Sequence, residues 1–329
     1  MLRAGVIGCR PVGVYHAAGI VDSEQAQLVA ACDFDRQTLD DFIAQWPDEK
    51  ITAHTNHRDM LADEKLDLVT IATSDHRHAD LVVDASEAGV KGIFCEKPLA
   101  TTLADADRMI AACKANDTIL SVDHTRRFQP LWRRAKELVV EGKIGNLQYI
   151  VATFTGPRAM LFRNGTHLLD VICYFADSKP VWLVAELEQG YEDYSEYRGD
   201  GGHDPATEPG ANAYIHFENG VKGFYIGGSK NTTPFTEQAE IVGSTGRIVV
   251  ANDKLGTLYQ GDTEEAIEIV ELPIHGIAAG VRELVSIVAD GGELVSPGHA
   301  GHTVVELLIG ILRSQQQGHS PVHFPLTRD

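Results

Sequence analysis

The sequence has few positive charges. It holds 28 lysines and arginines against 47 aspartates and glutamates, a formal net charge of −19 at pH 7. A surface with this balance repels phosphate backbones, so we expect no nucleic-acid partner. The chain also lacks any apolar run near the ~20 residues of a membrane-spanning helix, so we expect no membrane partner. A strand-like segment begins by Ala4, and we therefore expect no secretory leader and a cytoplasmic protein.

Cysteine is scarce, and its spacing is not that of disulfides or metal sites. The five cysteines are an odd number without paired spacing and lie mostly in apolar segments. Reduced, packed thiols are the simplest interpretation. The 14 histidines show no compact ligand spacing with cysteine, so we expect no metal. His76 and His78 stand two apart, but contact of one of them with a cofactor explains this better.

The chain is long enough for two domains. It has 329 residues, 43% of them hydrophobic, which suffices for a substantial core. The character of the sequence changes around Asp123. We therefore expect a first domain over residues 1–122 and a second over residues 123–329.

Strand-like and helix-like segments alternate through the first domain. Such alternation predicts a doubly wound parallel sheet with helices on both faces, a Rossmann fold. The expected strands cover residues 4–8, 28–33, 51–53, 66–72, 92–95 and 119–122, and the expected helices run from about residue 13 and over residues 35–46, 78–88 and 104–116.

A glycine pattern follows the first expected strand. Gly8 and Gly13 occupy the outer positions of a dinucleotide-binding Gly-x-Gly-x-x-Gly fingerprint, but Arg10 replaces the middle glycine. That side chain either pushes the loop outward or offers a cation to the phosphates. Asp33 ends the next strand, 20 residues beyond Gly13, where a carboxylate binds the adenosine ribose. Because it would repel a 2′-phosphate, we expect NAD, with NADP possible; the competing interpretation of Asp33 is a helix cap.

Polar residues gather where parallel strands end. Thr73 and His78 follow the fourth expected strand, and Glu96 and Lys97 follow the fifth, immediately before Pro98. Ligands of open α/β sheets bind at the carboxyl ends of strands. We expect these side chains to converge on a nicotinamide there, although a surface Glu-Lys pair would leave the same local pattern.

The second half is rich in strands. Two strand-like runs flank Asn219-Gly220, which predicts a hairpin with a type I′ turn. Residues 240–243 and 246–250 predict another strand pair, and the chain from Ile277 to about Arg313 looks helical. We expect a large, mostly antiparallel open sheet with helices on one face and the other face free for a partner subunit.

One helix-like segment of this half, residues 165–175, carries polar residues in an apolar setting. His167 and Asp170 are three apart and share one face. His167 is either a satisfied core residue or a general base, for which histidine has a suitable pKa. Asp170 fits a structural hydrogen-bonding role better than catalysis.

Together these features resemble the Gfo/Idh/MocA family of NAD(P)-dependent oxidoreductases over nearly the whole chain. The motifs that carry the resemblance are Gly8…Gly13, Ile71-Ala-Thr-x-x-x-x-His78, Cys95-Glu-Lys-Pro98, Arg126-Arg-Phe-x-Pro130, Gly142-x-Ile-Gly145 and Gly165-x-His-x-x-Asp170. The resemblance implies a Rossmann domain followed by a C-terminal α/β domain whose open sheet mediates homodimers or homotetramers.

The resemblance also assigns roles to residues. It implies that Lys97 contacts the substrate oxygen and the nicotinamide ribose, that the Lys97–Pro98 bond is cis, and that His167 is the acid/base group. The residues implied to hold the cofactor are Gly8, Arg10, Gly13, Asp33, Thr73, His78 and Glu96. Those expected to contact substrate are Arg127, Arg163 and Asp170.

Two segments depart from the family pattern. Arg163 stands where many relatives carry an Asp four residues before the catalytic histidine. A cation there would lower the pKa of the histidine, or it would bind an anionic group of the substrate. Residues 189–209, rich in Tyr, Asp, Glu and Gly, look like an insertion that is either a solvated loop or a lid on the site.

We therefore expect a dehydrogenase that moves a hydride between NAD and a carbinol carbon of a sugar, sugar derivative or cyclitol. An NAD-dependent glycoside hydrolase acting by transient oxidation remains an alternative, as do a non-catalytic ligand sensor of the same fold and an imine or enone reductase. Accumulation of NADH with substrate separates the dehydrogenase from the hydrolase.

Overall fold

The computed structural model describes residues 1–328 except 201, 203, 232–234 and 271. The chain forms two compact units. Unit 1 comprises Met1–Phe128 and Pro273–His302, and unit 2 comprises Gln129–Leu272 and Thr303–Asp329. Each unit is described by itself.

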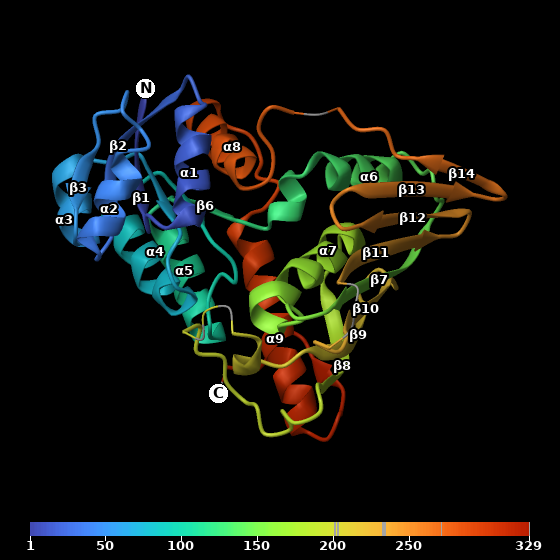
Figure 1. The fold of residues 1–329 in the computed structure, drawn as a ribbon. Helices are drawn as coiled ribbons and strands as arrows, with labels where there is room; N and C mark the ends of the chain where they lie inside the picture. Colours follow the sequence, from blue (N-terminus) through green and yellow to red (C-terminus); the bar gives the residue numbers. More distant parts are fainter. Residues whose placement is uncertain (201, 203, 232–234, 271, 329) are drawn as a thin grey trace. The chain divides into compact units, whose positions relative to one another are not determined.

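Unit 1 contains a six-stranded parallel sheet in the order β3-β2-β1-β4-β5-β6 (Figure 1). This is the strand order of a dinucleotide-binding Rossmann fold, so the expected fold class is confirmed. The strands are β1 (Leu2–Ile7), β2 (Ala26–Cys32), β3 (Thr52–His54), β4 (Leu68–Ile71), β5 (Gly92–Cys95) and β6 (Ile119–Val122).

The helices between these strands begin where the sequence supplies capping side chains. Asp35 accepts the backbone N–H of Thr38 at 2.7 Å, and Thr102 accepts that of Asp105 at 3.1 Å. Each bond satisfies one of the backbone donors that a helix start leaves without an intrahelical partner. The helices are α1 (Pro11–Val21), α2 (Arg36–Ile43), α3 (His57–Glu64), α4 (His78–Glu87) and α5 (Leu103–Ala115).

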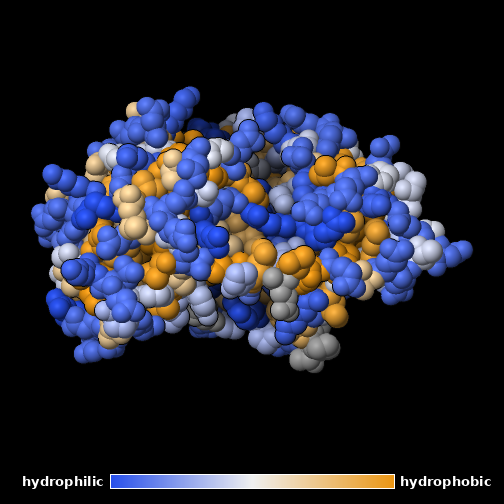
Figure 2. Space-filling model, turned by 90° about the horizontal axis from the view of Figure 1, so that it is seen from above, coloured by the Kyte–Doolittle hydropathy of each residue, from blue (hydrophilic) through white to orange (hydrophobic). Residues whose placement is uncertain are grey.

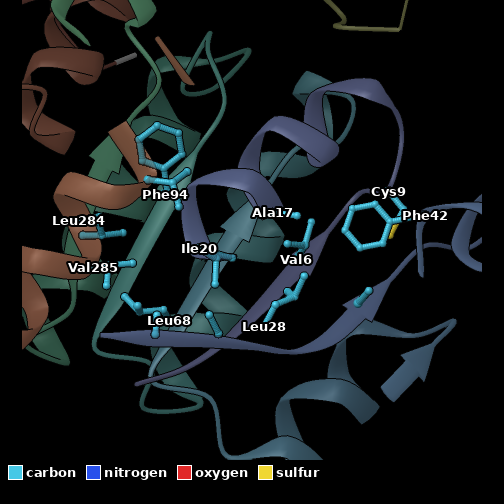
Figure 3. Packing of buried hydrophobic residues seen from close by; sticks show 14 of the residues in the cluster. Val6, Cys9, Ala17, Ile20, Leu28, Phe42, Leu68, Phe94, Leu284 and Val285 are labelled. Carbon is cyan, nitrogen blue, oxygen red and sulfur yellow. The ribbon is translucent and has the colours of Figure 1, made fainter. Parts of the chain in front are cut away.

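A helix from late in the sequence completes unit 1. Leu284 and Val285 of α8 (Ile277–Asp290) share a buried cluster with Ile20 of α1 and Phe94 of β5 (Figure 3). The close approach of α8 to α1 requires glycine at residue 19, because a Cβ there would lie 2.4 Å from the Ala278 carbonyl oxygen. The division of the chain therefore departs from the single boundary expected between residues 122 and 123.

The helical tail is not one helix. We expected continuous helix from Ile277 to about Arg313, but α8 ends at Asp290 and α9 (Gly298–Gln316) begins eight residues later. Gly291 and Gly292 adopt φ values of 83° and 132° in the break. Residues without a side chain adopt such values readily, and a proline at residue 297 then precedes the new helix.

Unit 2 contains a nine-stranded sheet in the order β14-β13-β12-β11-β7-β10-β9-β8-β15. Its neighbouring strands are antiparallel except β7 and β10, which confirms the expected mostly antiparallel sheet. The strands are β7 (Leu147–Thr155), β8 (Pro180–Leu187), β9 (Ala211–Phe217), β10 (Lys222–Gly227), β11 (Thr236–Gly243), β12 (Gly246–Ala251), β13 (Leu255–Gln260), β14 (Thr263–Ala266) and β15 (Val322–His323).

The two faces of this sheet differ. One face packs on helices, with α6 (Pro130–Val140) on β12 and α7 (Thr166–Ala176) on β7 and β10. Strand residues alternate between buried and half-buried, as a sheet with one covered face requires. The half-buried face carries aromatic contacts, Trp182 with Tyr214 and Tyr214 with Phe224, each pair with ring centroids 5.2 Å apart.

The turn between β9 and β10 is not the expected type I′ turn. That turn needs positive φ at both central residues, whereas in this loop Gly220 has a φ of 83° and Asn219 does not have a positive φ. Asn219 is instead fixed by its side chain, which donates to the Ala176 carbonyl at 2.9 Å and accepts from the Val221 N–H at 3.2 Å. The hairpin itself is present, with antiparallel pairing of its strands.

The exposed surface is mainly polar. Hydrophilic residues predominate on the face shown in Figure 2, with apolar residues scattered among them, consistent with a net charge of −19. Among the helices of the described residues, none is long and apolar enough to cross a membrane.

Candidate functional site

The loop between β1 and α1 closes tightly enough to require both fingerprint glycines. Gly8 has a φ of 95°, and a Cβ on it would lie 2.2 Å from the Ala72 carbonyl oxygen. A Cβ on Gly13 would lie 1.9 Å from the Gly8 carbonyl oxygen. No side chain fits at either residue, so the backbone of this loop remains accessible at the carboxyl edge of the sheet.

Arg10, in place of the middle glycine, is accommodated without strain. It is the N-cap residue of α1 with φ −74° and ψ 177°, an extended conformation open to any residue, and its side chain is exposed. Hydrogen bonds from Thr38, with a smaller contribution from the charge of Arg10, hold the pKa of Asp35 below its usual range. The guanidinium is thus a charge at the surface of the loop that would meet the phosphates.

Asp33 ties the end of β2 to that loop. Its side chain is buried; Oδ2 accepts the Cys9 N–H at 2.9 Å and Oδ1 accepts the Asp35 N–H at 3.0 Å. These bonds fix the orientation of the carboxylate while each oxygen retains a lone pair for a further donor. Asp33 does not cap α2, since Asp35 does so, and the helix-cap interpretation of Asp33 is wrong.

Thr73, Glu96 and Lys97 follow β4 and β5 at the same edge of the parallel sheet. The Lys97–Pro98 peptide bond is cis, as the resemblance implied. His78 is buried and its ring spans the two loops, with Nδ1 3.0 Å from the Pro98 carbonyl oxygen and Nε2 3.3 Å from the Thr73 carbonyl oxygen. Burial lowers the pKa of His78, so the neutral ring joins the two loops.

Glu96 lies at the centre of a buried cluster of titratable groups. Its Oε1 is 3.2 Å from His16 Nε2, and its Oε2 accepts the Lys97 N–H at 3.2 Å. The Asp123 carboxyl is hydrogen-bonded to the Glu96 carboxyl. Burial lowers the pKa of His16 to about 4 and also lowers the pKa of Lys97, while it raises the pKa of Glu96.

The sequence-based prediction missed two members of this cluster. Asp123 stands directly after β6, at the same kind of strand end that identified Glu96 and Lys97, so the signal was present. His16 lies inside α1, three residues after Gly13, where a lone histidine on an apolar helix is ordinarily a core residue. Only the fold shows that its ring meets Glu96.

In unit 2 the predicted residues lie at the start of α7. Arg163 is half-buried in a π-helical turn, η3 (Leu161–Gly165), and His167 and Asp170 are buried on α7 directly after it. His167 and Asp170 are three residues apart on this helix and share one face, as expected. Imidazole, guanidinium and carboxyl groups are thus concentrated in one and a half helical turns.

Residues of the predicted insertion hold this turn in place. The buried Glu208 side chain accepts the backbone N–H groups of Phe162 at 2.6 Å and Arg163 at 3.1 Å through one oxygen, Oε2. Tyr197 stacks on Phe162 with ring centroids 4.3 Å apart, and Arg163 Nη2 donates to its hydroxyl at 3.5 Å. Residues 201 and 203 of the insertion lie outside the described residues, but its described part is not merely a solvated loop.

A buried phenol also borders the start of α7. Tyr225 on β10 is 1% exposed, and its hydroxyl has no hydrogen-bond partner among the described residues. A Cβ on Gly165 would lie 2.2 Å from that oxygen, which explains glycine just before the helix. Burial raises the pKa of Tyr225, so the phenol is neutral.

Arg127 has a different environment from the other expected substrate residues. It is buried in unit 1, where Nη1 donates to the Val295 carbonyl at 2.8 Å, between the end of η2 (Thr125–Phe128) and the segment before α9. No three His, Cys, Asp or Glu side chains among the described residues gather as a metal site would require.

Two family models match the chain. The model of the oxidoreductase family with an NAD-binding Rossmann fold, GFO_IDH_MocA, matches residues 2–124. The GFO/IDH/MocA C-terminal domain model matches residues 132–249. Together the two models cover well over half of the chain.

Individual proteins agree with these matches. The chain is 28% identical over 267 residues to myo-inositol 2-dehydrogenase of Thermotoga maritima, covering 80% of this chain and 79% of the relative. It is 30% identical over 236 residues to 1-carboxy-3-chloro-3,4-dihydroxycyclohexa-1,5-diene dehydrogenase of Comamonas testosteroni, covering 67% and 56%. An inositol dehydrogenase homologue from Azotobacter vinelandii, crystallised with NADH and myo-inositol, shares the fold with a TM-score of 0.81 at 16% identity over 98% and 97% of the two chains.

Proposed function

This chain belongs to the GFO/IDH/MocA family of oxidoreductases, and on that premise we propose that it transfers a hydride between NAD and the carbinol carbon of a sugar or cyclitol. The observation that carries the proposal is the set of titratable groups at the carboxyl edge of the Rossmann sheet, with Lys97 after the cis peptide bond and Glu96 beside it. The relatives named for inositol and a cyclic diol support a polyol substrate.

The cofactor we propose is NAD. Asp33 would accept the ribose hydroxyls, for which its carboxylate is already oriented by the Cys9 and Asp35 amides. A 2′-phosphate there would meet a like charge, at a cost of about 4 kcal/mol for a separation of ~4 Å and an effective dielectric of ~20. Gly8 and Gly13 would allow close approach of the pyrophosphate, and Arg10 would offset part of its charge. Thr73 and Glu96 would border the nicotinamide half, and His78 would hold their loops.

Bound NAD supplies acceptance of the hydride at C4 of its nicotinamide. We propose that His167 takes the hydroxyl proton as the carbon–hydrogen bond breaks, leaving a carbonyl product and a protonated imidazole. Lys97 would donate a hydrogen bond to the same oxygen and stabilise the alkoxide charge that develops there. Asp170 would act beside His167 as an orienting group rather than a proton acceptor.

The substrate we favour carries an anionic group. Arg163 brings a guanidinium to the turn before His167, and a planar guanidinium suits a carboxylate or phosphate. The Comamonas relative acts on a carboxyl-bearing ring by its name. In an Arg163→Ala variant the Michaelis constant for acidic sugars should rise about tenfold or more, while that for neutral polyols changes little. An unchanged constant for every acidic sugar tested would remove Arg163 from the binding site.

The primary test is a panel of neutral and acidic sugars and cyclitols with NAD, followed by NADH absorbance. Dehydrogenase activity predicts stoichiometric NADH and a ketone product. With the active substrate, Lys97→Ala should lose about 100- to 1000-fold in kcat. His167→Asn should lose at least as much, and Arg127→Lys should tell whether that buried residue matters to substrate at all. Product formation without NADH would replace the proposal with transient oxidation and bond cleavage.

We also propose that the open face of the unit 2 sheet joins copies of this chain in a homodimer or homotetramer. Contiguous half-exposed aromatic side chains on one sheet face are typical of an interface. Trp182→Glu combined with Phe224→Glu should lower the mass measured by light scattering to that of a single chain. The same mass for the wild type and this variant would contradict the proposed interface.

A further inference from the structure

Asp123 lies against the end of the neighbouring strand. Its backbone N–H donates to the Cys95 carbonyl at 2.8 Å, which places residue 123 beside the start of the Glu96-Lys97 segment. Its side chain is only 1% exposed, although it is a carboxyl. A buried carboxyl is stable only when it is neutral or well supplied with donors.

The donors around Asp123 are too few for a carboxylate. Oδ2 accepts the Thr125 hydroxyl at 3.1 Å, but Oδ1 has no hydrogen-bond partner among the described residues when both carboxyls are taken as acceptors. The Asp123 side chain faces the Glu96 carboxyl. Two ionised carboxylates accept hydrogen bonds and donate none, so this contact requires one proton between them.

The surroundings of Glu96 decide which partner is ionised. Its two oxygens face donors, the His16 ring nitrogen and the Lys97 amide, each at 3.2 Å. Hydrogen bonds from such donors favour the charged form. Asp123 has the hydroxyl of Thr125 alone. The proton therefore belongs on Asp123, and Asp123 donates to Glu96.

We propose that Asp123 is a positioning residue for Lys97: it shares one proton with Glu96, fixes the orientation of that carboxylate, and keeps the pair at a single negative charge beside the ammonium. The proposal rests on the function proposed for Lys97 in catalysis. The pair would otherwise present two negative charges to Lys97 or leave Glu96 free to turn away. A shared proton avoids both.

Other charged or titratable groups face the pair and Lys97 from the surrounding elements. They are His16 of α1, Asp75 of η1 (Asp75–Arg77), Cys95 of β5 and Arg126 of η2. Asp75 acts in the same direction as Glu96 on Lys97, and Arg126 acts against both. His16 is neutral near pH 7, and burial keeps the Cys95 thiol protonated by raising its pKa. The charge state of the carboxyl pair is therefore the variable that Asp123 controls.

Two substitutions test the proposal through the pH profile of kcat/KM. Asp123→Asn keeps a neutral donor toward Glu96, so the limb of the profile that depends on Lys97 should stay within about 0.3 pH units of wild type. Asp123→Ala removes the donor, so Glu96 loses its orientation and kcat/KM should fall about 10- to 100-fold with a shifted limb. Thr125→Val is the matched control, since it removes a bond to Asp123 but not the proton.

Two kinetic outcomes overturn the proposal. A downward shift of the Lys97 limb by about one unit in Asp123→Asn would mean that wild-type Asp123 is ionised and supplies a full charge. Wild-type kinetics and an unshifted profile in Asp123→Ala, with only a lower Tm, would mean that Asp123 serves the fold alone.

A measurement that needs no substrate separates this proposal from the proposed function. In the apo protein labelled with ¹³C at aspartate carboxyls, the signal that disappears in Asp123→Asn should keep the chemical shift of a protonated acid through neutral pH. The shift of an ionised carboxylate at pH 7 would overturn the shared proton, even if Asp123→Ala does not fold. Failure of every sugar in the panel would overturn the dehydrogenase proposal instead and leave this result standing.

Discussion

The backbone N–H of Cys9 donates a 2.9 Å hydrogen bond to the carboxylate of Asp33. The bond joins the glycine loop after β1 to the acid at the end of β2. The acid proposed to bind the cofactor ribose thus also fixes the loop proposed to bind the pyrophosphate.

Replacing Asp33 should therefore damage both halves of cofactor recognition. In Asp33→Ala the Cys9 and Asp35 amides lose a charged acceptor, and we expect NAD affinity to fall about 10- to 100-fold, with a weaker preference over NADP. Cofactor titration by fluorescence measures both affinities. Asp48→Asn, at an exposed acid of the same unit, is the control. NAD affinity unchanged in Asp33→Ala would exclude this residue from the cofactor site.

Burial of His16 should make stability depend on pH. The folded pKa of about 4 lies below the usual value of 6.5, so the unfolded chain binds an extra proton between these values. Stability contributed by the neutral ring is thus complete above pH ~6.5 and is lost as pH falls toward 4, by about 3 kcal/mol in all. Urea unfolding at several pH values should show this slope in the wild type and a weaker one in His16→Gln. Parallel curves for the two proteins would contradict it.

Removing the buried hydroxyl of Tyr225 should stabilise the apo protein. Because that hydroxyl has no partner among the described residues, its desolvation is uncompensated, and Tyr225→Phe should raise the free energy of unfolding by about 1–3 kcal/mol. Tyr214→Phe, whose ring lies on the open face of the same sheet, should change it by less than about 0.5 kcal/mol. Denaturant titration compares the two. A destabilised Tyr225→Phe would show that the hydroxyl is bonded in solution.

Glu208 should be needed for the turn that carries Arg163. Glu208→Ala leaves the Phe162 and Arg163 N–H groups without their acceptor, and we expect a loss of about 2–5 kcal/mol in unfolding free energy. Glu208→Gln retains an acceptor oxygen and should lose less. Glu196→Gln, exposed in the same insertion, is the control. Equal stability of the three variants would mean that the carboxylate does not support this turn.

Local sequence patterns were sufficient to predict the elements and their order. The alternation of apolar runs and helix signals located the six strands of unit 1 within a few residues, because each period is set by nearby residues. The polar strand ends identified Glu96 and Lys97 for the same reason. The turn at Asn219-Gly220 was misassigned because a side-chain bond from Asn219 to Ala176, 43 residues away, fixes its backbone.

What could not be predicted depends on contacts between distant segments. The role of Asp123 arises from its contact with Glu96 across two strands, and that of His16 from a helix crossing over both. Glu208 acts on a turn 45 residues earlier through backbone amides, which carry no sequence signature. The place of α8 in unit 1 likewise depends on packing against α1 rather than on any feature of residues 277–290.

The packing of α8 on α1 has a consequence for biosynthesis. A nascent polypeptide emerging from the ribosome exposes residues 1–128 long before α8, and at ~5–20 residues per second the delay is on the order of 10–30 s. During that interval α1 lacks Val281, Leu284 and Val285, each of which is 1% exposed in the finished protein. Burial of such side chains contributes about 1.5–3 kcal/mol apiece. The amino-terminal half therefore reaches full stability only after almost all of the chain has been translated.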